Sequence, residues 1–155
     1  MELLEVIPDP VSLIESMRAV GYSVQAAIAD LLDNSISAKA DSIEVKYDAS
    51  DSPFVAILDN GTGMAPNELT NAMRHGSHNP IDRREPNDLG RFGLGLKTAS
   101  LSQCRKLTVI SKKDGAISAR RWDLDVVQDA VKWFVVVPPE IELETLPLFQ
   151  SLKSL

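Results

Sequence analysis

The chain has 155 residues, 44% hydrophobic and 25% charged, which is average usage for one globular domain. Sixteen Lys and Arg against 22 Asp and Glu give a net charge of −6, so direct binding to bare nucleic acid is not expected. A single cysteine, Cys104, excludes an internal disulfide and favours a cytoplasmic protein. No apolar run approaches the length of about 18 residues that a membrane-spanning helix needs.

Two helices are expected at the start of the chain. Pro10 follows Asp9, a favourable pair for a helix cap and a first helical position, so we predict a short helix over residues 10–20 that Gly21 ends. Ser23 supplies the same kind of cap to a second helix, which runs to about residue 36.

The rest of the chain combines strands, short helices and one long polar stretch. We predict strands over 42–47 and 54–58, a helix over 66–74, a loop over 76–91, a helix from 93 to about 101, and strands over 106–111, 117–124 and 131–137. This order favours one domain over residues 1–155, an α/β (α+β) two-layer sandwich with helices on one face of a mixed sheet. An acidic and apolar tail stops in mid-pattern, so we expect a chain that is truncated at its C-terminus.

The second predicted helix places Asp30 and Asn34 on one face, because they lie one turn apart. A carboxylate one turn before an amide suits a general base near water and an oxygen ligand for Mg²⁺. An amphipathic helix that simply keeps polar residues in water gives the same pattern. This motif alone is therefore a weak signal.

Asp59 ends an apolar strand and is followed at once by Gly61 and Gly63. A buried carboxylate needs a donor, and the exocyclic amine of adenine is one, while glycines let the backbone approach a flat ring. An Asx-type turn at the end of a strand explains the same residues equally well.

A glycine-rich segment, Gly93-Leu94-Gly95-Leu96-Lys97, follows the long polar loop and opens a helix. Backbone N–H groups at such a helix start form a cradle for phosphate, and Lys97 would add a cation. The spacing is not that of a P-loop, and no strand precedes the segment as in a dinucleotide fingerprint.

The three motifs together are more specific than any of them alone. They are Asp30-x-x-x-Asn34, Asp59-x-Gly61-x-Gly63 and Gly93-x-Gly95. In this order and spacing, over about residues 23–112, the chain resembles the GHKL ATPases: type II topoisomerases, heat-shock chaperones, histidine kinases and MutL. Residues 27–45 and the segment LGRFGLGLKTAS are most similar to the MORC, MutL-like and bacterial Hsp90-like branches. The resemblance implies the Bergerat ATP-binding fold, with ATP and Mg²⁺ as ligands.

Carried over residue by residue, the resemblance assigns the adenine side of a pocket. It implies that Asn34 ligates Mg²⁺ and that Asp59 bonds the adenine amine. Gly61 and Gly63 would shape the adenine pocket, and Met64 would pack near the base.

The resemblance also assigns the phosphate side. The glycine-rich segment, residues 93–96, would hold the phosphates through its amides, with Lys97 close to them, and residues 65–92 would be the ATP lid. In the family a Ser or Thr on a later strand supports the adenine-binding acid, and Thr108 and Ser111 are both candidates.

One position departs from the family pattern. The catalytic base there is usually Glu, whereas Asp30 is shorter by one methylene. A base must come within about 2.6–3.2 Å of the proton it takes, or act through one water. Asp30 would therefore work slowly, through a bridging water, or not at all.

Three functions remain open at this point. The first is Mg²⁺-dependent ATP binding with slow hydrolysis, in which lid closure signals to a partner domain or subunit. The second is an ATP-binding switch that does not hydrolyse, and the third is a histidine-kinase-type phosphotransfer module. Besides ATP, the expected partner is an ATP-dependent homodimer or a downstream transducer domain, with no role for a membrane.

Overall fold

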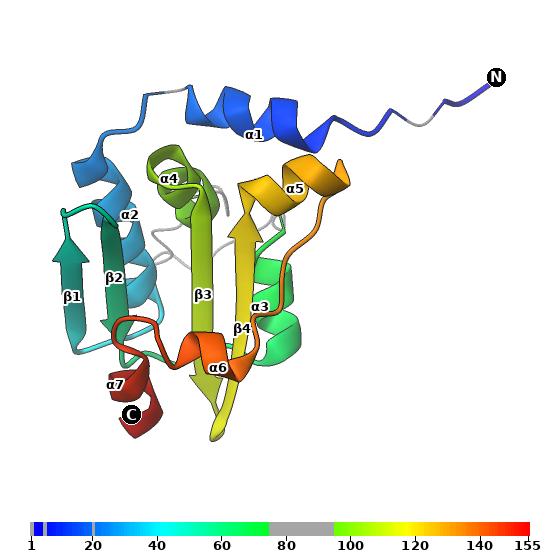
Figure 1. Ribbon diagram of the computed structural model, residues 1–155. Helices are drawn as coiled ribbons and strands as arrows, with labels where there is room; N and C mark the ends of the chain where they lie inside the picture. Colours follow the sequence, from blue (N-terminus) through cyan, green and yellow to red (C-terminus); the bar gives the residue numbers. More distant parts are fainter. Residues whose placement is uncertain (1, 5, 20, 75–94) are drawn as a thin grey trace.

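The computed structural model describes residues 2–4, 6–19, 21–74 and 95–155 (Figure 1). The predicted loop over 76–91 lies outside the described residues. So do Gly93 and Leu94 and the greater part of the expected lid over 65–92. Within the described part of the chain, no helix is long and apolar enough to cross a membrane.

The described strands form two antiparallel hairpins. Strand β1 (Ile43–Asp48) pairs with β2 (Phe54–Asp59), and β3 (Lys106–Lys113) pairs with β4 (Ala116–Asp123). Asp114 and Gly115 join β3 to β4 with φ angles of 51° and 78°, the left-handed pair that a two-residue hairpin turn requires.

The α/β class is confirmed. The described residues form two separate two-stranded sheets, however, and not the single mixed sheet that we expected. Strands β2 and β3 run in the same direction, as in a mixed sheet, yet they stand apart and every ladder lies within a hairpin (Figure 1). The segment after β2 reaches only the last residues of β3, where the N–H of Met64 donates to Ser111 Oγ at 2.7 Å. Because this bond uses a side chain, it joins the hairpins without extending a ladder.

Helices α2, α3 and α4 lie behind the strands, and α1 and α5 cross one end (Figure 1). Their bounds are α1 (Pro10–Arg18), α2 (Val24–Ser37), α3 (Pro66–Ala72), α4 (Gly95–Gln103) and α5 (Leu124–Ala130). The expected caps are confirmed: Asp9 Oδ1 accepts from the N–H of Ser12 at 2.8 Å, and Ser23 Oγ accepts from that of Ala26 at 3.1 Å.

The main core lies between these helices and β3–β4. Trp122 is buried and its ring meets Trp133 edge to face at 6.0 Å between centroids, so both act as packing residues. Leu69 and Met73 of the α3 segment have no exposed surface. The first part of the expected lid is therefore a packed helix. The buried residues of this core are Ile14, Leu69, Met73, Leu101, Trp122, Leu124 and Val127.

Two short helices cover the other face, although all helices were expected on one. They are α6 (Glu140–Leu143) and α7 (Phe149–Ser154), and they lie in front of the strands in Figure 1. Leu143, Phe149 and Leu152 are buried there against Ala119, with Leu58 packed beside them. The apolar residues of the tail therefore form a second small core.

The strand expected over residues 131–137 is wrong. Asp123 accepts from the N–H of Asp125 at 3.1 Å and so caps α5, which turns the chain away from the sheet. Val131 then ends the helix with a φ of 50°. Only one bridge follows, in which Arg121 and Val136 exchange backbone hydrogen bonds of 2.8 Å.

Candidate functional site

Helix α2 meets the end of β2 through Ser35 and Asp59. Ser35 is buried, and its hydroxyl donates to Asp59 Oδ2 at 3.0 Å. The other carboxylate oxygen, Oδ1, accepts from the N–H of Gly61 at 2.9 Å. The Asp59 carboxylate is thus fixed in orientation by donors from two different segments. Ser35 was not expected at the site, although a polar residue on the buried side of an amphipathic helix is the signal that could have found it.

The loop after Asp59 is clamped between α2 and β3. A Cβ on Gly61 would lie 2.7 Å from the carbonyl oxygen of Ala38, which follows α2. Gly63 has a φ of 63°, and a Cβ there would lie 2.1 Å from the carbonyl oxygen of Lys112 on β3. Both glycines are therefore required by contacts of the chain with itself, whatever ligand they face.

Ser111 and Thr108, the two candidates for supporting Asp59, point to opposite faces of β3. Ser111 is buried behind the strand, where its Oγ accepts from Met64. The Oγ1 of Thr108 accepts from Nε of Arg121 at 2.8 Å. Ser111 therefore lies at the candidate site, but the described hydroxyl that bonds Asp59 is that of Ser35.

Asp30 and Asn34 lie one turn apart on α2, as expected. The Asp30 carboxylate faces the start of α4, since a Cβ on Gly95 would lie 3.9 Å from its Oδ2. The Nδ2 atom of Asn34 is buried and has no hydrogen-bond partner among the described residues. A buried group without a partner costs about 1–3 kcal/mol, so this amide is suited to a partner beyond the described residues, such as a ligand.

Asn34 also fits the role expected for it with Mg²⁺. A half-turn about the Cβ–Cγ bond exchanges the amide nitrogen and oxygen, so the unpaired position can present an oxygen. Magnesium keeps several waters and binds phosphate oxygens, and it needs few protein ligands. In the described part of the chain, no three His, Cys, Asp or Glu side chains gather around a metal position.

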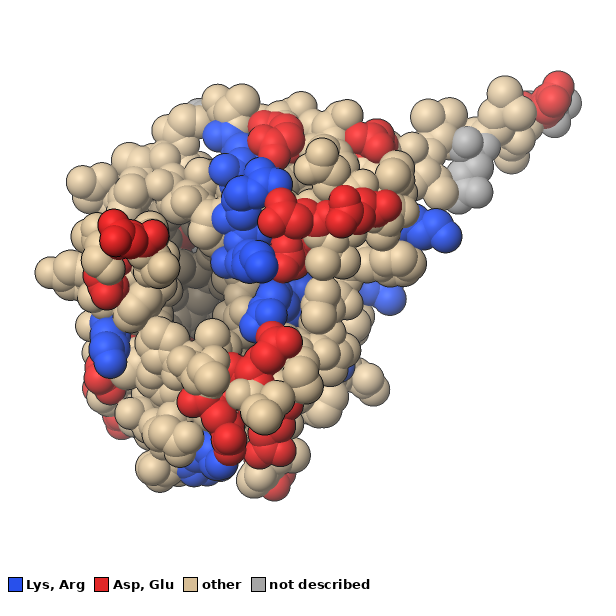
Figure 2. Space-filling model, in the orientation of Figure 1, with Lys and Arg blue, Asp and Glu red and all other residues tan. Residues whose placement is uncertain are grey.

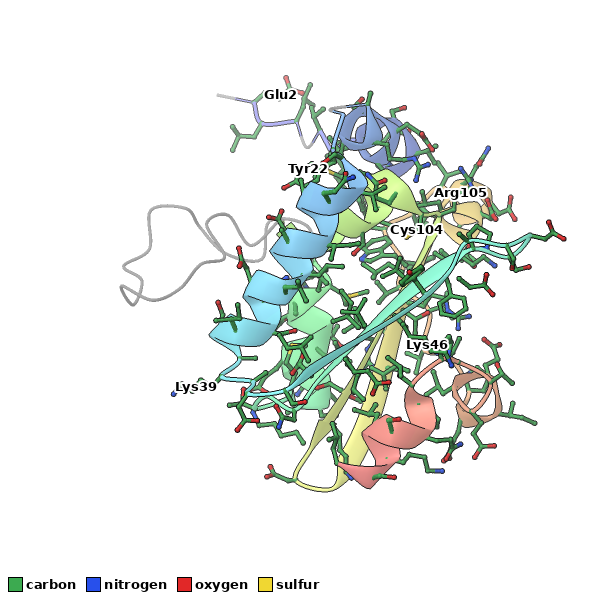
Figure 3. All side chains as sticks on the ribbon, turned by 90° about the vertical axis from the view of Figure 1, so that its left-hand side faces the viewer. Glu2, Tyr22, Lys39, Lys46, Cys104 and Arg105 are labelled. Carbon is green, nitrogen blue, oxygen red and sulfur yellow. The ribbon has the colours of Figure 1, made fainter. Side chains whose placement is uncertain are left out.

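Tyr22 is a contact of Asp30 that the motifs did not indicate. Its hydroxyl donates to Asp30 Oδ2. This bond, aided by burial, raises the pKa of the Tyr22 phenol above its ordinary value. Figure 3 shows Tyr22 at the beginning of α2, next to α4.

Lys97 is directed into the protein. It is 1% exposed, and its Nζ donates to the carbonyl oxygen of Ala72, the last residue of α3, at 2.7 Å. Burial lowers the pKa of its ammonium to about 8. In this structure, therefore, the ammonium of Lys97 bonds the end of α3. The resemblance instead implies that it lies close to the phosphates. Leu96, beside it, is half-buried.

The face that carries α6 and α7 holds Thr108, whose partner Arg121 bonds Glu142 of α6. Figure 2 shows it hollowed between the hairpins, with a band of Lys and Arg over β3 and β4. Several cations on or next to this hairpin pair with carboxylates: Arg105 lies 2.6 Å from Asp125, Lys106 lies 3.1 Å from Asp123, and Arg121 lies 2.7 Å from Glu142.

The described parts of the three motifs therefore meet around α2. Ser35 brings the strand-end acid to this helix, and Asp30 brings the helix to the start of α4. Between these two contacts lies Asn34, whose Nδ2 has no partner in the described ranges of the chain. A carboxylate with both oxygens fixed suits recognition of an amine, and the amide of Asn34 suits a cation. The start of α4 favours an anion, and the Asp30 carboxylate beside it suits a water or a cation.

Comparison with known proteins points the same way. Residues 22–154 match a family described as histidine kinase-, DNA gyrase B- and HSP90-like ATPases. The chain is 30% identical over 131 residues to the ATPase morc-1 of Caenorhabditis elegans, which covers 81% of this chain and 15% of that protein. It is 30% identical over 128 residues to the DNA mismatch repair protein MutL of Herminiimonas arsenicoxydans, which covers 79% of this chain and 21% of that protein. It is also 31% identical over 96 residues to the ATPase MORC2B of Mus musculus, covering 59% of this chain and 9% of that protein.

The chain thus spans about a fifth or less of the length of these relatives. The family match begins at Tyr22 and includes all three motifs. The similarity to MORC and MutL proteins confirms the resemblance first read from those motifs. The chain therefore belongs to the family of histidine kinase-, DNA gyrase B- and HSP90-like ATPases.

Proposed function

We propose that this domain binds ATP together with Mg²⁺, hydrolyses it slowly, and passes the resulting conformational signal to a partner domain or subunit. The observation that supports this most is the arrangement around α2. One helix holds Asp59 through Ser35 at one end and approaches Gly95 through Asp30 at the other. Between them it carries Asn34, whose Nδ2 no described residue bonds.

The adenine would bind at the Asp59 end. The carboxylate already accepts from Ser35 and Gly61, and each oxygen keeps a further lone pair for the exocyclic amine of the base. Gly61 and Gly63 leave no side chain in the way of the ring, and Met64 stands next in the chain, half-buried. Recognition would therefore rest on a carboxylate that the protein has oriented beforehand.

The triphosphate would bind at the Asp30 end. The amides of Gly95 and Leu96 open α4, a nine-residue helix, and helix starts favour anions. The resemblance of the sequence adds the amides of Gly93 and Leu94 to this phosphate site. Asn34 would hold Mg²⁺, which when bound neutralises charge on the phosphate oxygens. Asp30 would take a proton from the attacking water, directly or through a second water.

The signal requires a movement on binding. The expected lid over 65–92 includes α3, whose Leu69 is fully buried in the core together with Met73. The closing movement in this proposal is that of the lid over 65–92, as the resemblance implies it. A second copy of the chain or a following transducer domain would receive it.

The first experiment measures ATP binding by calorimetry with and without Mg²⁺, and phosphate release at saturating Mg·ATP. We expect Asp59→Asn to weaken ATP binding by about 10- to 100-fold, since a hydrogen bond to a charged group contributes about 1.5–3 kcal/mol. Asn34→Ala should remove the Mg²⁺ dependence. Asp129→Asn and Gln128→Ala, which alter exposed residues of α5, are the matched controls. Absence of any ATP binding at millimolar concentration would overturn the proposal.

A switch that binds ATP without hydrolysis is the second candidate, because Asp30 is one methylene shorter than the usual Glu and its Oδ2 already bonds Tyr22. Phosphate release by Asp30→Glu separates the two functions. A large gain over a wild-type protein that releases no phosphate supports the switch. A loss of measurable wild-type turnover supports hydrolysis through Asp30.

A further inference from the structure

The contact between Tyr22 and Asp30 links the candidate base to a residue outside the three motifs. We infer that Tyr22 is a positioning residue for the Asp30 carboxylate: its phenol holds Oδ2, and Oδ1 remains as the atom that takes the proton from the attacking water. This inference rests on the proposed hydrolysis.

Tyr22 is itself fixed at both ends. Gly21, with a φ of 81°, turns the chain after α1, and Ser23 caps α2 immediately afterwards. Between them, the carbonyl oxygen of Tyr22 accepts from Nε2 of Gln103, on α4, at 2.6 Å. The backbone of Tyr22 is therefore tied to both helices that carry the phosphate end of the site, and its phenol returns to Asp30 from this fixed point.

The bond leaves the two oxygens of Asp30 in different situations. Oδ2 accepts from the phenol and also faces the start of α4, near the Cβ position of Gly95. Within the described ranges of the chain, no donor bonds Oδ1. A carboxylate fixed by one strong donor loses its freedom to rotate, and rigid placement matters most for a short side chain whose reach is limiting.

In the step that this arrangement serves, the oxygen of a water molecule forms a bond to the γ-phosphorus. The bond from that phosphorus to the oxygen bridging the β and γ groups breaks, and its electron pair leaves with ADP. The proton of the water passes to Oδ1 of Asp30. Tyr22 keeps its own proton throughout and acts only through Asp30.

The test compares Tyr22→Phe with Tyr47→Phe in the full chain. Tyr47 is the only other tyrosine in the sequence and is 74% exposed on β1, so it is a matched control. We expect Tyr22→Phe to lower kcat for phosphate release about tenfold while the Kd for ATP, by calorimetry, stays within about twofold. Tyr47→Phe should change neither.

A double variant distinguishes positioning from general stability. If Tyr22 acts through Asp30, then Tyr22→Phe adds no further loss of kcat in an Asp30→Asn background. Losses that multiply, or a kcat for Tyr22→Phe equal to that of the wild type, overturn the inference while leaving ATP hydrolysis in place. A wild-type protein that releases no phosphate contradicts the proposed hydrolysis, and this role of Tyr22 with it.

A spectroscopic readout needs no turnover. In Tyr47→Phe protein, Tyr22 is the remaining tyrosine, and its phenolate absorbance reports its titration. We expect its pKa to lie above the ordinary value, because the bond to Asp30 favours the protonated phenol, and to fall towards that ordinary value when Asp30→Asn is added. An unchanged titration in the added variant would show that the pair does not form, and would overturn the inference.

Discussion

The two ends of the site along α2 are built differently. At the Ser35 end, both oxygens of Asp59 have donors, and the loop after it is clamped between α2 and β3. At the Asp30 end, Nδ2 of Asn34 has no hydrogen-bond partner among the described residues, and the Lys97 side chain bonds the end of α3. The Asp59 end is therefore organised by contacts within the chain, whereas the Asp30 end keeps a buried polar atom to which the described residues offer no partner.

The largest effect on this contrast is expected from adding a side chain to the loop between Asp59 and Met64. Gly63→Ala would place a Cβ 2.1 Å from the carbonyl oxygen of Lys112, at a φ of 63° that side chains rarely adopt. We expect the free energy of unfolding in urea to fall by about 4 kcal/mol or more, because backbone must shift on both sides.

Gly115→Ala is the matched control for this change. Gly115 also has a positive φ, of 78°, but a Cβ there would meet nothing within 4 Å. Its cost should be limited to the backbone conformation, about 1–2 kcal/mol. Equal losses for the two variants would mean that the close approach to β3 contributes nothing to the loop.

A smaller effect is expected from Lys97, on the phosphate side. Burial lowers the pKa of Lys97 to about 8, from an ordinary 10.5, so between these values the unfolded chain binds more protons than the folded one. The stability of the wild type relative to Lys97→Met should therefore rise as the pH increases from about 8 to 10.5, by at most about 3 kcal/mol.

Urea unfolding at a series of pH values measures this difference. Lys46→Met, which removes an exposed lysine of β1, is the control and should show no such rise relative to the wild type (Figure 3). If the difference in free energy of unfolding between wild type and Lys97→Met did not change with pH, the ammonium of Lys97 would not be desolvated. Lys97 would then be available to phosphate, and the contrast between the two ends would weaken.

The smallest effect sharpens the comparison at the base end. Ser35→Ala removes one of the two donors to Asp59 and leaves Gly61 as the other. We expect ATP affinity to fall about tenfold, since one hydrogen bond to a charged group is lost and water can replace part of it. Calorimetry checks this against Ser16→Ala, an exposed serine of α1, which should bind ATP like the wild type.

Local sequence was enough for most helices and strands. Asp9 and Ser23 cap the helices that they were expected to cap, because a cap depends on residues only three positions away. The strand expected over 131–137 failed because Asp123 caps α5 instead, a competition between two local signals that the alternation of residues does not reveal. Whether the two hairpins join into one sheet likewise depends on pairing between segments far apart in the sequence.

The sequence by itself determined the family and the candidate residues, because the motifs place a carboxylate, an amide and glycines at spacings that helices and strand ends convert directly into geometry. Only the tertiary structure decided which partners these residues have. Ser35 bonds Asp59 across 24 positions, Tyr22 bonds Asp30 around the start of a helix, and Lys97 reaches Ala72 across 25. Such contacts join separate elements, and their packing sets the direction of each side chain, which no local pattern encodes.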